Sequence, residues 1–113
     1  MAQKLGKVII SPSVLSIIAR QTTLSVPGVA RMAGASVRRL LGSRDGSDVK
    51  VQVDDDMVAL DLHIIAESDV NMLELSREIQ CKVTRTIHEI VGMAVREINV
   101  HIADVSDEPR GAH

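Results

Sequence analysis

The sequence has 113 residues, of which 45% are hydrophobic and 25% charged, the composition of one ordinary globular domain that can bury a core. A net charge of −2 gives no global excess of positive charge for a polyanion, and no apolar run approaches the ~20 residues of a membrane-spanning helix. The chain contains no Phe, Tyr or Trp, which excludes aromatic cages and aromatic base-stacking platforms, and its single cysteine excludes an internal disulfide.

The first third of the chain predicts a strand, a helix and a second strand. The β-branched run at residues 7–10 predicts the first strand, and Ser11 followed by Pro12 is typical of a helix start. Residues 25–28 end the helix because Pro27 disfavours helical geometry at the residue before it, and residues 29–32 predict the second strand. We expect the apolar stripe of the helix to consist of Val14, Ile17, Ile18, Gln21 and Leu24.

The remainder predicts a hairpin, a long helix and a closing strand. Residues 36–41 are compatible with either a strand or a helical turn. Alternating apolar residues predict paired strands at residues 49–53 and 58–64, joined by a tight acidic connection. A helix is expected over residues 71–91, with Asp69 or Asn71 as its cap and Gly92 at its end, followed by a strand at residues 96–103. The stripe of that helix is Met72, Leu75, Ile79, Val83, Ile87 and Ile90.

These elements predict an α+β fold, a two-layer sandwich with both amphipathic helices on one face of a small, mixed, mostly antiparallel sheet. The element order is β-α-β-β-β-α-β. A single domain is expected over residues 1–105, with a flexible C-terminal tail at residues 106–113. The other face of the sheet is expected to stay open to solvent or a partner, and to carry Lys50, Gln52, Asp61, His63, Asn99 and His101.

Several short motifs in order resemble the bacterial alkaline-shock-protein family of general and envelope stress proteins. They cover roughly residues 7–105. They are the Val-Pro-Gly-Val turn at residues 26–29, the hairpin at residues 49–64, Val70-Asn71 before the long helix, Ile79-Gln80 with Val83 inside it, and the closing strand at residues 95–102.

The resemblance implies a small, non-enzymatic cytoplasmic protein that accumulates under stress and self-associates. Some members of that family gather at the inner face of the membrane through an anchored partner. For this chain the resemblance therefore implies two partners, a second copy of itself and a membrane-anchored relative. It implies no cofactor and no direct insertion into the membrane.

Catalytic and metal sites are weakly indicated. His63 and His101 are expected on the exposed faces of two strands, near Asp61 and Glu97, and the sequence leaves open whether these strands are neighbours. His with carboxylate can bind zinc, but no established ligand spacing supports a site. Cys81 falls in the middle of the second helix beside its apolar stripe, which favours a buried structural thiol over a nucleophile. We therefore predict no catalytic, cofactor or metal site.

Nucleic-acid binding is the alternative function. The segment at residues 31–50 carries an excess of positive charge that could hold phosphates. Against it, residues 54–69 carry six carboxylates and no balancing cation, and the chain lacks a Gly-x-x-Gly clamp for a nucleic-acid backbone. The basic side chains of the segment are Arg31, Arg38, Arg39, Arg44 and Lys50.

Opposite charges on one small surface also favour self-association. Copies that meet head to tail would bring the acidic connection of one chain against the basic segment of the next and form rings or filaments. The interaction residues predicted on this basis are Arg38, Arg39 and Arg44 on the basic side, and Asp54, Asp55 and Asp56 on the acidic side.

Overall fold

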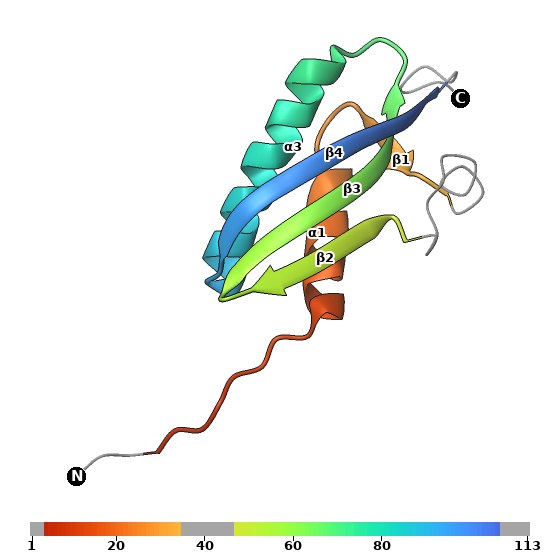
Figure 1. Ribbon diagram of the computed structural model, residues 1–113. Helices are drawn as coiled ribbons and strands as arrows, with labels where there is room; N and C mark the ends of the chain where they lie inside the picture. The colour runs from red at the N-terminus through yellow and green to blue at the C-terminus, as the bar shows by residue number, and fades with distance from the viewer. Residues whose placement is uncertain (1–3, 35–46, 107–113) are drawn as a thin grey trace.

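The structure is a computed structural model that describes residues 4–34 and 47–106. Its central element is the strand β3 (Met57–Glu67), which pairs with all three other strands (Figure 1). Antiparallel partners on one side of β3 are β2 (Val49–Asp54) and, farther along, β1 (Val29–Met32). On its other side β3 pairs in parallel with β4 (Ala94–Ser106). The sheet is therefore mixed and mostly antiparallel, as predicted.

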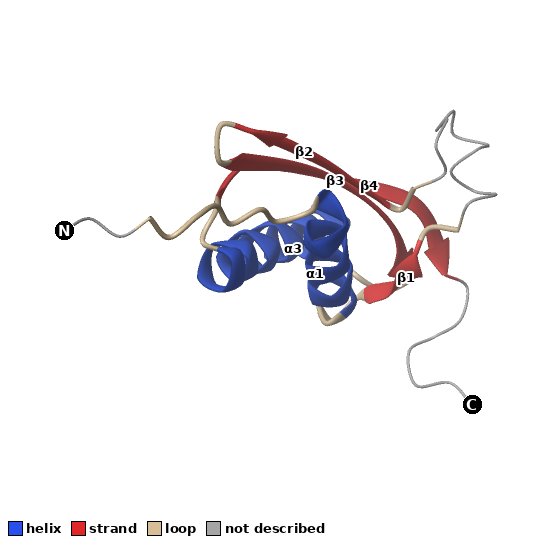
Figure 2. Cartoon of the chain, turned by 90° about the horizontal axis from the view of Figure 1, so that it is seen from below, coloured by secondary structure: helices blue, strands red, loops and turns tan. Residues whose placement is uncertain are grey.

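Two helices cover one face of the sheet and leave the other open (Figure 2). They are α1 (Pro12–Leu24) and α3 (Met72–Thr86), and α3 continues into the short π-helix η1 (Ile87–Val91). The core between the layers is aliphatic, and it includes alternate residues of β3, which carries Leu60, Leu62 and Ile64 into it with no exposed surface. This confirms the predicted α+β, two-layer architecture.

The long helix begins and ends where the sequence predicts. The Asn71 side chain accepts a hydrogen bond of 3.0 Å from the backbone N–H of Glu74, and thereby satisfies one of the unpaired donors at the helix start. Gly92 ends η1 in the left-handed conformation, with φ of 80°. The middle of the predicted stripe is buried, whereas Met72 and Ile90 at its two ends are exposed.

The first helix packs with a different face from the one predicted. Its buried residues are Leu15, Ala19, Thr22 and Thr23, while Val14, Ile17 and Leu24 are exposed. The two threonines can be buried because each hydroxyl donates to a carbonyl one helical turn earlier, over 2.7 Å in both cases. The predicted stripe was therefore wrong except at Ile18, which packs partly buried against the core.

The strand predicted at residues 7–10 is absent. Residues 4–11 have no regular secondary structure; Ile10 packs partly buried against the core, and the residues before it extend away from the body of the molecule (Figure 1). A β-branched run favours an extended backbone, but a strand also needs a neighbour that supplies hydrogen bonds. Among the described residues this segment has no such neighbour, so the element order begins at α1.

The closing strand is longer than the sequence predicts. The closing strand continues to Ser106, which pairs with Glu67 of β3, so Val105 and Ser106 belong to the sheet and the predicted tail does not include residue 106. The undecided segment at residues 36–41 and the rest of the predicted tail lie outside the described residues. The turn at residues 26–29 is as predicted, with Gly28 at φ of 105°.

Candidate functional site

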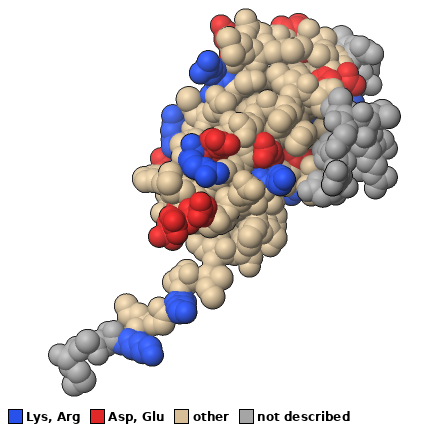
Figure 3. All heavy atoms as spheres, in the orientation of Figure 1, with Lys and Arg blue, Asp and Glu red and all other residues tan. Residues whose placement is uncertain are grey.

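The acidic connection is a two-residue turn at one end of the sheet. Asp54 ends β2, and Asp55 and Asp56 form the turn with φ of 47° and 67°. Two successive positive φ values define the type I′ turn that matches the twist of a hairpin, and such turns favour Asn and Gly. All three carboxylates are exposed, and no cation within the described residues pairs with them. The turn therefore presents a compact negative charge (Figure 3).

The predicted partners of these carboxylates are Arg38, Arg39 and Arg44, and all three lie outside the described residues. The contact between acidic turn and basic segment therefore stays a prediction. At the described ends of that segment, the side chains of Arg31 and Lys50 are exposed.

Asp48 forms an ion pair with α1. The Arg20 guanidinium donates two hydrogen bonds to its carboxylate, over 2.8 Å and 2.7 Å. These bonds raise the pKa of Arg20 above its usual value, although partial burial acts in the opposite direction. This ion pair joins the residue that precedes β2 to α1.

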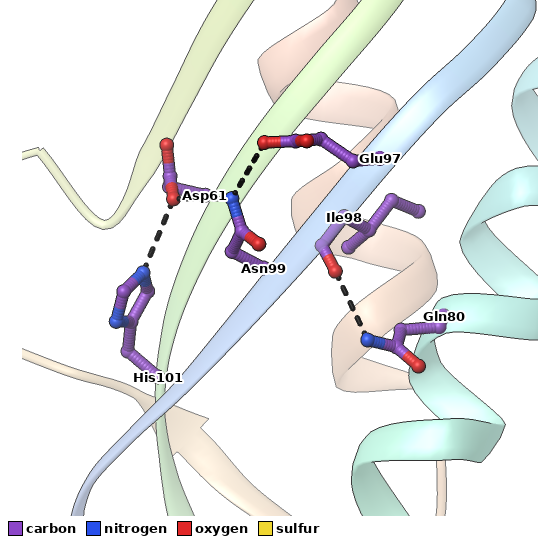
Figure 4. Close-up of polar contacts among 6 residues, drawn as sticks. All are labelled: Asp61, Gln80, Glu97, Ile98, Asn99 and His101. Carbon is purple, nitrogen blue, oxygen red and sulfur yellow. Dashed lines mark hydrogen bonds and ion pairs between the residues drawn. The ribbon is translucent and has the colours of Figure 1, made fainter.

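A polar ladder runs across the open face of the sheet, on the neighbouring strands β3 and β4 (Figure 4). The Asn99 amide donates over 3.1 Å both to Asp61 and to Glu97, and His101 Nε2 lies 3.1 Å from Asp61 Oδ1. The rings of His63 and His101 stack, with centroids 4.4 Å apart and planes within 8°. The sequence prediction of an open polar face is confirmed, and the structure adds that the two histidines, whose approach the sequence left open, lie side by side.

The ladder has the geometry of surface hydrogen bonds more than that of a reactive centre. Within residues 4–34 and 47–106, no group of three or more His, Cys, Asp and Glu is placed to hold one metal ion. Asp61 is shared between the Asn99 amide and the His101 imidazole. The arrangement orients side chains across two strands, which is a structural or recognition role.

Cys81 is exposed, and the prediction of a buried thiol was wrong. The buried stripe of α3 contains Ile79 and Val83, and a residue two positions from each lies about 200° around the helix at 3.6 residues per turn. The thiol lines a shallow depression on the outer surface of α3, together with Gln80, Thr84, Arg85 and His88.

Exposed aliphatic side chains concentrate on the N-terminal segment and on the outer face of α1. In residues 4–10, Leu5, Val8 and Ile9 are 90%, 89% and 83% exposed. On α1, Val14 and Ile17 are each nearly half exposed and lie one turn apart. Sequence reasoning assigned Val14 and Ile17 to the apolar stripe of the helix because of their spacing, a signal that does not say what covers them.

Fold and surface together define a small α+β domain with an open polar sheet face (Figure 2), an acidic turn and an exposed aliphatic N-terminal segment. The family model for the alkaline shock protein 23 family, described as having a cell envelope-related function, matches residues 1–107. The chain belongs to this family. No solved structure matches it.

Two curated relatives come from Bacillus subtilis (strain 168). The chain is 30% identical to the uncharacterized protein YqhY over 105 residues, which cover 89% of this chain and 78% of that protein. It is 24% identical to the uncharacterized protein YloU over 108 residues, which cover 90% of each. The family therefore gives this chain a cell envelope-related function. Within the described parts of the chain, no helix combines the length and apolar character needed to cross a bilayer.

Proposed function

We propose that this protein is a non-enzymatic interaction module that self-associates, docks on a membrane-anchored partner, or does both, at the cytoplasmic face of the bacterial envelope under stress. Membership of a family with a cell envelope-related function supports the location. The aliphatic surface on the N-terminal segment and α1 supports a role in contact, because neighbouring exposed apolar side chains mark interaction sites.

The observation that carries the proposal is the acidic turn. Asp55 and Asp56 occupy left-handed backbone positions that Gly or Asn would occupy at lower cost, and adjacent carboxylates repel one another. Local rules are broken in this way at functional positions more often than elsewhere. A complementary positive surface on a second molecule would convert that repulsion into attraction.

The basic segment of a second copy is the complementary surface that the chain itself offers. Arg38, Arg39 and Arg44 supply three cations, which match the number of carboxylates at residues 54–56. Exposed ion pairs contribute only about 0–1 kcal/mol each, so the contact needs several pairs and aliphatic burial together. We therefore expect reversible assembly that weakens with salt.

Sedimentation velocity of the full chain at two salt concentrations tests this function. Assembly is expected at low salt, and it should weaken as salt rises through a few tenths molar, where the Debye length falls below about 8 Å. The double variant Arg38→Glu, Arg39→Glu should dissolve the assembly. Adding Asp54→Lys and Asp55→Lys to the same chain should partly restore it, because the charges are then exchanged. A strict monomer at high protein concentration in low salt contradicts self-association.

The alternative function and the anchored partner are distinguished by recovery from native cells. The protein is isolated at moderate salt, and the bound material is identified by mass spectrometry and by nuclease treatment. Recovery of a membrane-anchored envelope protein that binds the purified chain directly supports docking. Recovery mainly of RNA or DNA supports nucleic-acid binding through the basic segment at residues 31–50.

A further inference from the structure

The N-terminal segment has the sequence of a strand and lacks a strand partner. We call residues 4–9 the arm, because Ile10 is already partly buried against the core of its own chain. The β-branched residues Val8 and Ile9 of the arm favour extended backbone. In the structure the arm extends from the body, with Val8 and Ile9 almost fully exposed (Figure 1). An exposed, extended and apolar segment is a ready donor for pairing with a sheet edge.

The two long edges of the sheet differ in how open they are. Along β4, the Gln80 side chain of α3 donates a hydrogen bond of 3.0 Å to the Ile98 carbonyl, on the side away from β3 (Figure 4). A helix that occupies edge carbonyls protects the edge against another strand. Among the described residues, β2 pairs only with β3, and no side chain hydrogen-bonds to its backbone. The edge of β2 is the more available acceptor.

The pairing pattern shows which backbone groups that edge offers. In a hairpin with a two-residue turn, the residues that flank the turn form a hydrogen-bonded pair, here Asp54 with Met57. Hydrogen-bonded and non-hydrogen-bonded pairs alternate along an antiparallel ladder. The backbone N–H and C=O of Val49, Val51 and Val53 therefore point away from β3, toward the open edge.

Charge selects the direction of the added strand. The arm carries Lys4 and Lys7, and β2 runs toward the carboxylates at residues 54–56 (Figure 3). An arm antiparallel to β2 places its basic end beside the acidic turn. The arm of the same chain cannot reach this arrangement, because it leaves α1 near the turn and would run parallel to β2 (Figure 1). The donor must therefore come from a second copy.

We propose that the arm of one copy adds as an antiparallel strand to the outer edge of β2 in a second copy. In the register that sets Val8 opposite Val51, Val8 lies on the helix-covered side of the sheet. Lys7 then lies opposite Gln52 on the open side of the sheet. Asp54 is the next residue of β2 on that side. Each copy offers one arm and one edge, so the contact is head to tail and extends into rings or filaments. This inference rests on the self-association proposed above and names its backbone contact.

The first test compares two substitutions of one arm residue in the full chain. Val8→Pro removes an N–H that strand addition requires, whereas Val8→Ile keeps the N–H and the β propensity. Residue 8 is 89% exposed, so neither change disturbs the fold, which circular dichroism verifies. By sedimentation velocity we expect Val8→Pro to weaken assembly by at least about tenfold and Val8→Ile to leave it unchanged.

The second test traps the contact by disulfide formation in a Cys81→Ser background. In Lys7→Cys with Gln52→Cys, both thiols lie on the same face of the sheet. Residues 7 and 52 form a non-hydrogen-bonded pair, in which the Cα separation suits a disulfide. Val8→Cys with Gln52→Cys places the thiols on opposite faces and serves as the control. Covalent dimers and higher oligomers are expected from the first pair and not from the control.

The outcomes separate this inference from the proposed function. Assembly that resists Val8→Pro but dissolves on charge reversal at residues 38 and 39 overturns strand addition and leaves self-association standing. A disulfide within a single chain shows that the arm folds back on its own β2, which also overturns the inference. A wild-type chain that stays monomeric in low salt overturns both.

Discussion

Replacing Gly28 tests the turn that joins α1 to the sheet. Gly28 has φ of 105°, a backbone conformation that L-residues rarely adopt, and its carbonyl accepts a hydrogen bond of 2.9 Å from the N–H of Glu67 at the end of β3. A Cβ at this position would lie 3.0 Å from Leu75 Cδ1 and 3.2 Å from Val70 Cγ1. Gly28→Ala therefore meets both backbone strain and a steric conflict.

The two costs can be estimated separately. A positive φ costs an L-residue about 1–2 kcal/mol, and crowding a close-packed site costs about 1–3 kcal/mol. Leu75 is 4% exposed and belongs to the core, so it cannot swing aside into solvent. The sum is about 2–5 kcal/mol, a large part of the stability of a small domain. At about 4–8 °C per kcal/mol, Gly28→Ala should lower Tm by at least about 10 °C, and Gly28→Val by more.

Other glycines of the same chain provide matched controls for a thermal melt followed by circular dichroism. Gly92 has φ of 80°, and a Cβ added there would have no neighbouring atom within 4 Å. Gly92→Ala therefore measures the cost of the positive φ without a steric conflict. Gly34 has neither a positive φ nor a neighbour within 4 Å, so Gly34→Ala should leave Tm unchanged. We expect the highest Tm for Gly34→Ala, a lower one for Gly92→Ala, and the lowest for Gly28→Ala. If Gly28→Ala melts together with Gly34→Ala, the turn is not built as described.

Two further predictions concern the helix starts and the alternative function. Asn71→Ala should cost about 1 kcal/mol in urea denaturation because it removes a capping hydrogen bond, whereas Ser11→Ala should be near neutral because the Ser11 side chain makes none. In fluorescence anisotropy with labelled oligonucleotides, we expect no measurable binding at physiological salt. Any binding at low salt should weaken steeply with added salt, and should weaken uniformly across sequences in Arg38→Ala with Arg39→Ala. A salt-resistant, sequence-specific complex would reverse the ranking of the two functions.

The hairpin and the long helix were predicted correctly because each is marked by more than one local sequence signal. The hairpin has alternating apolar residues on both sides of a tight connection, and the long helix has a capping residue, a stripe and a terminal glycine. The structure adds the order of the strands in space, which no local pattern encodes. In particular, β4 pairs in parallel with β3, although the two are separated by α3 and η1.

The candidate site was predictable in its charges and not in its geometry. Acidic residues at a hairpin turn are visible in the sequence, and so is the alternation that puts His63 and His101 on the open face. The stacking of these two rings depends on the register between β3 and β4, in which the two histidines are directly paired. The open edge of β2 depends on which strands lie side by side, and that knowledge comes only with the sheet order.

Two of the errors share a physical cause. Sequence reasoning assigned the run at residues 7–10 to a strand and Val14 and Ile17 to a buried stripe. The structure leaves the run without a strand partner and these two side chains nearly half exposed. Apolar spacing predicts that a residue is covered, but the covering surface can belong to another molecule. If copies supply that cover, both patterns are correct for the assembly and wrong only for the single chain.

Amide hydrogen exchange at two protein concentrations tests this explanation directly. In dilute protein the arm should exchange quickly, since residues 4–9 have no secondary structure. In concentrated protein at low salt, the arm and the outward amides of Val51 and Val53 should become protected together, because one contact covers both. Amides inside the β2–β3 ladder, such as that of Gln52, should change little and serve as an internal control. If sedimentation shows assembly while the arm exchanges equally fast at both concentrations, the exposed apolar pattern is a property of the single chain, and another surface holds the copies together.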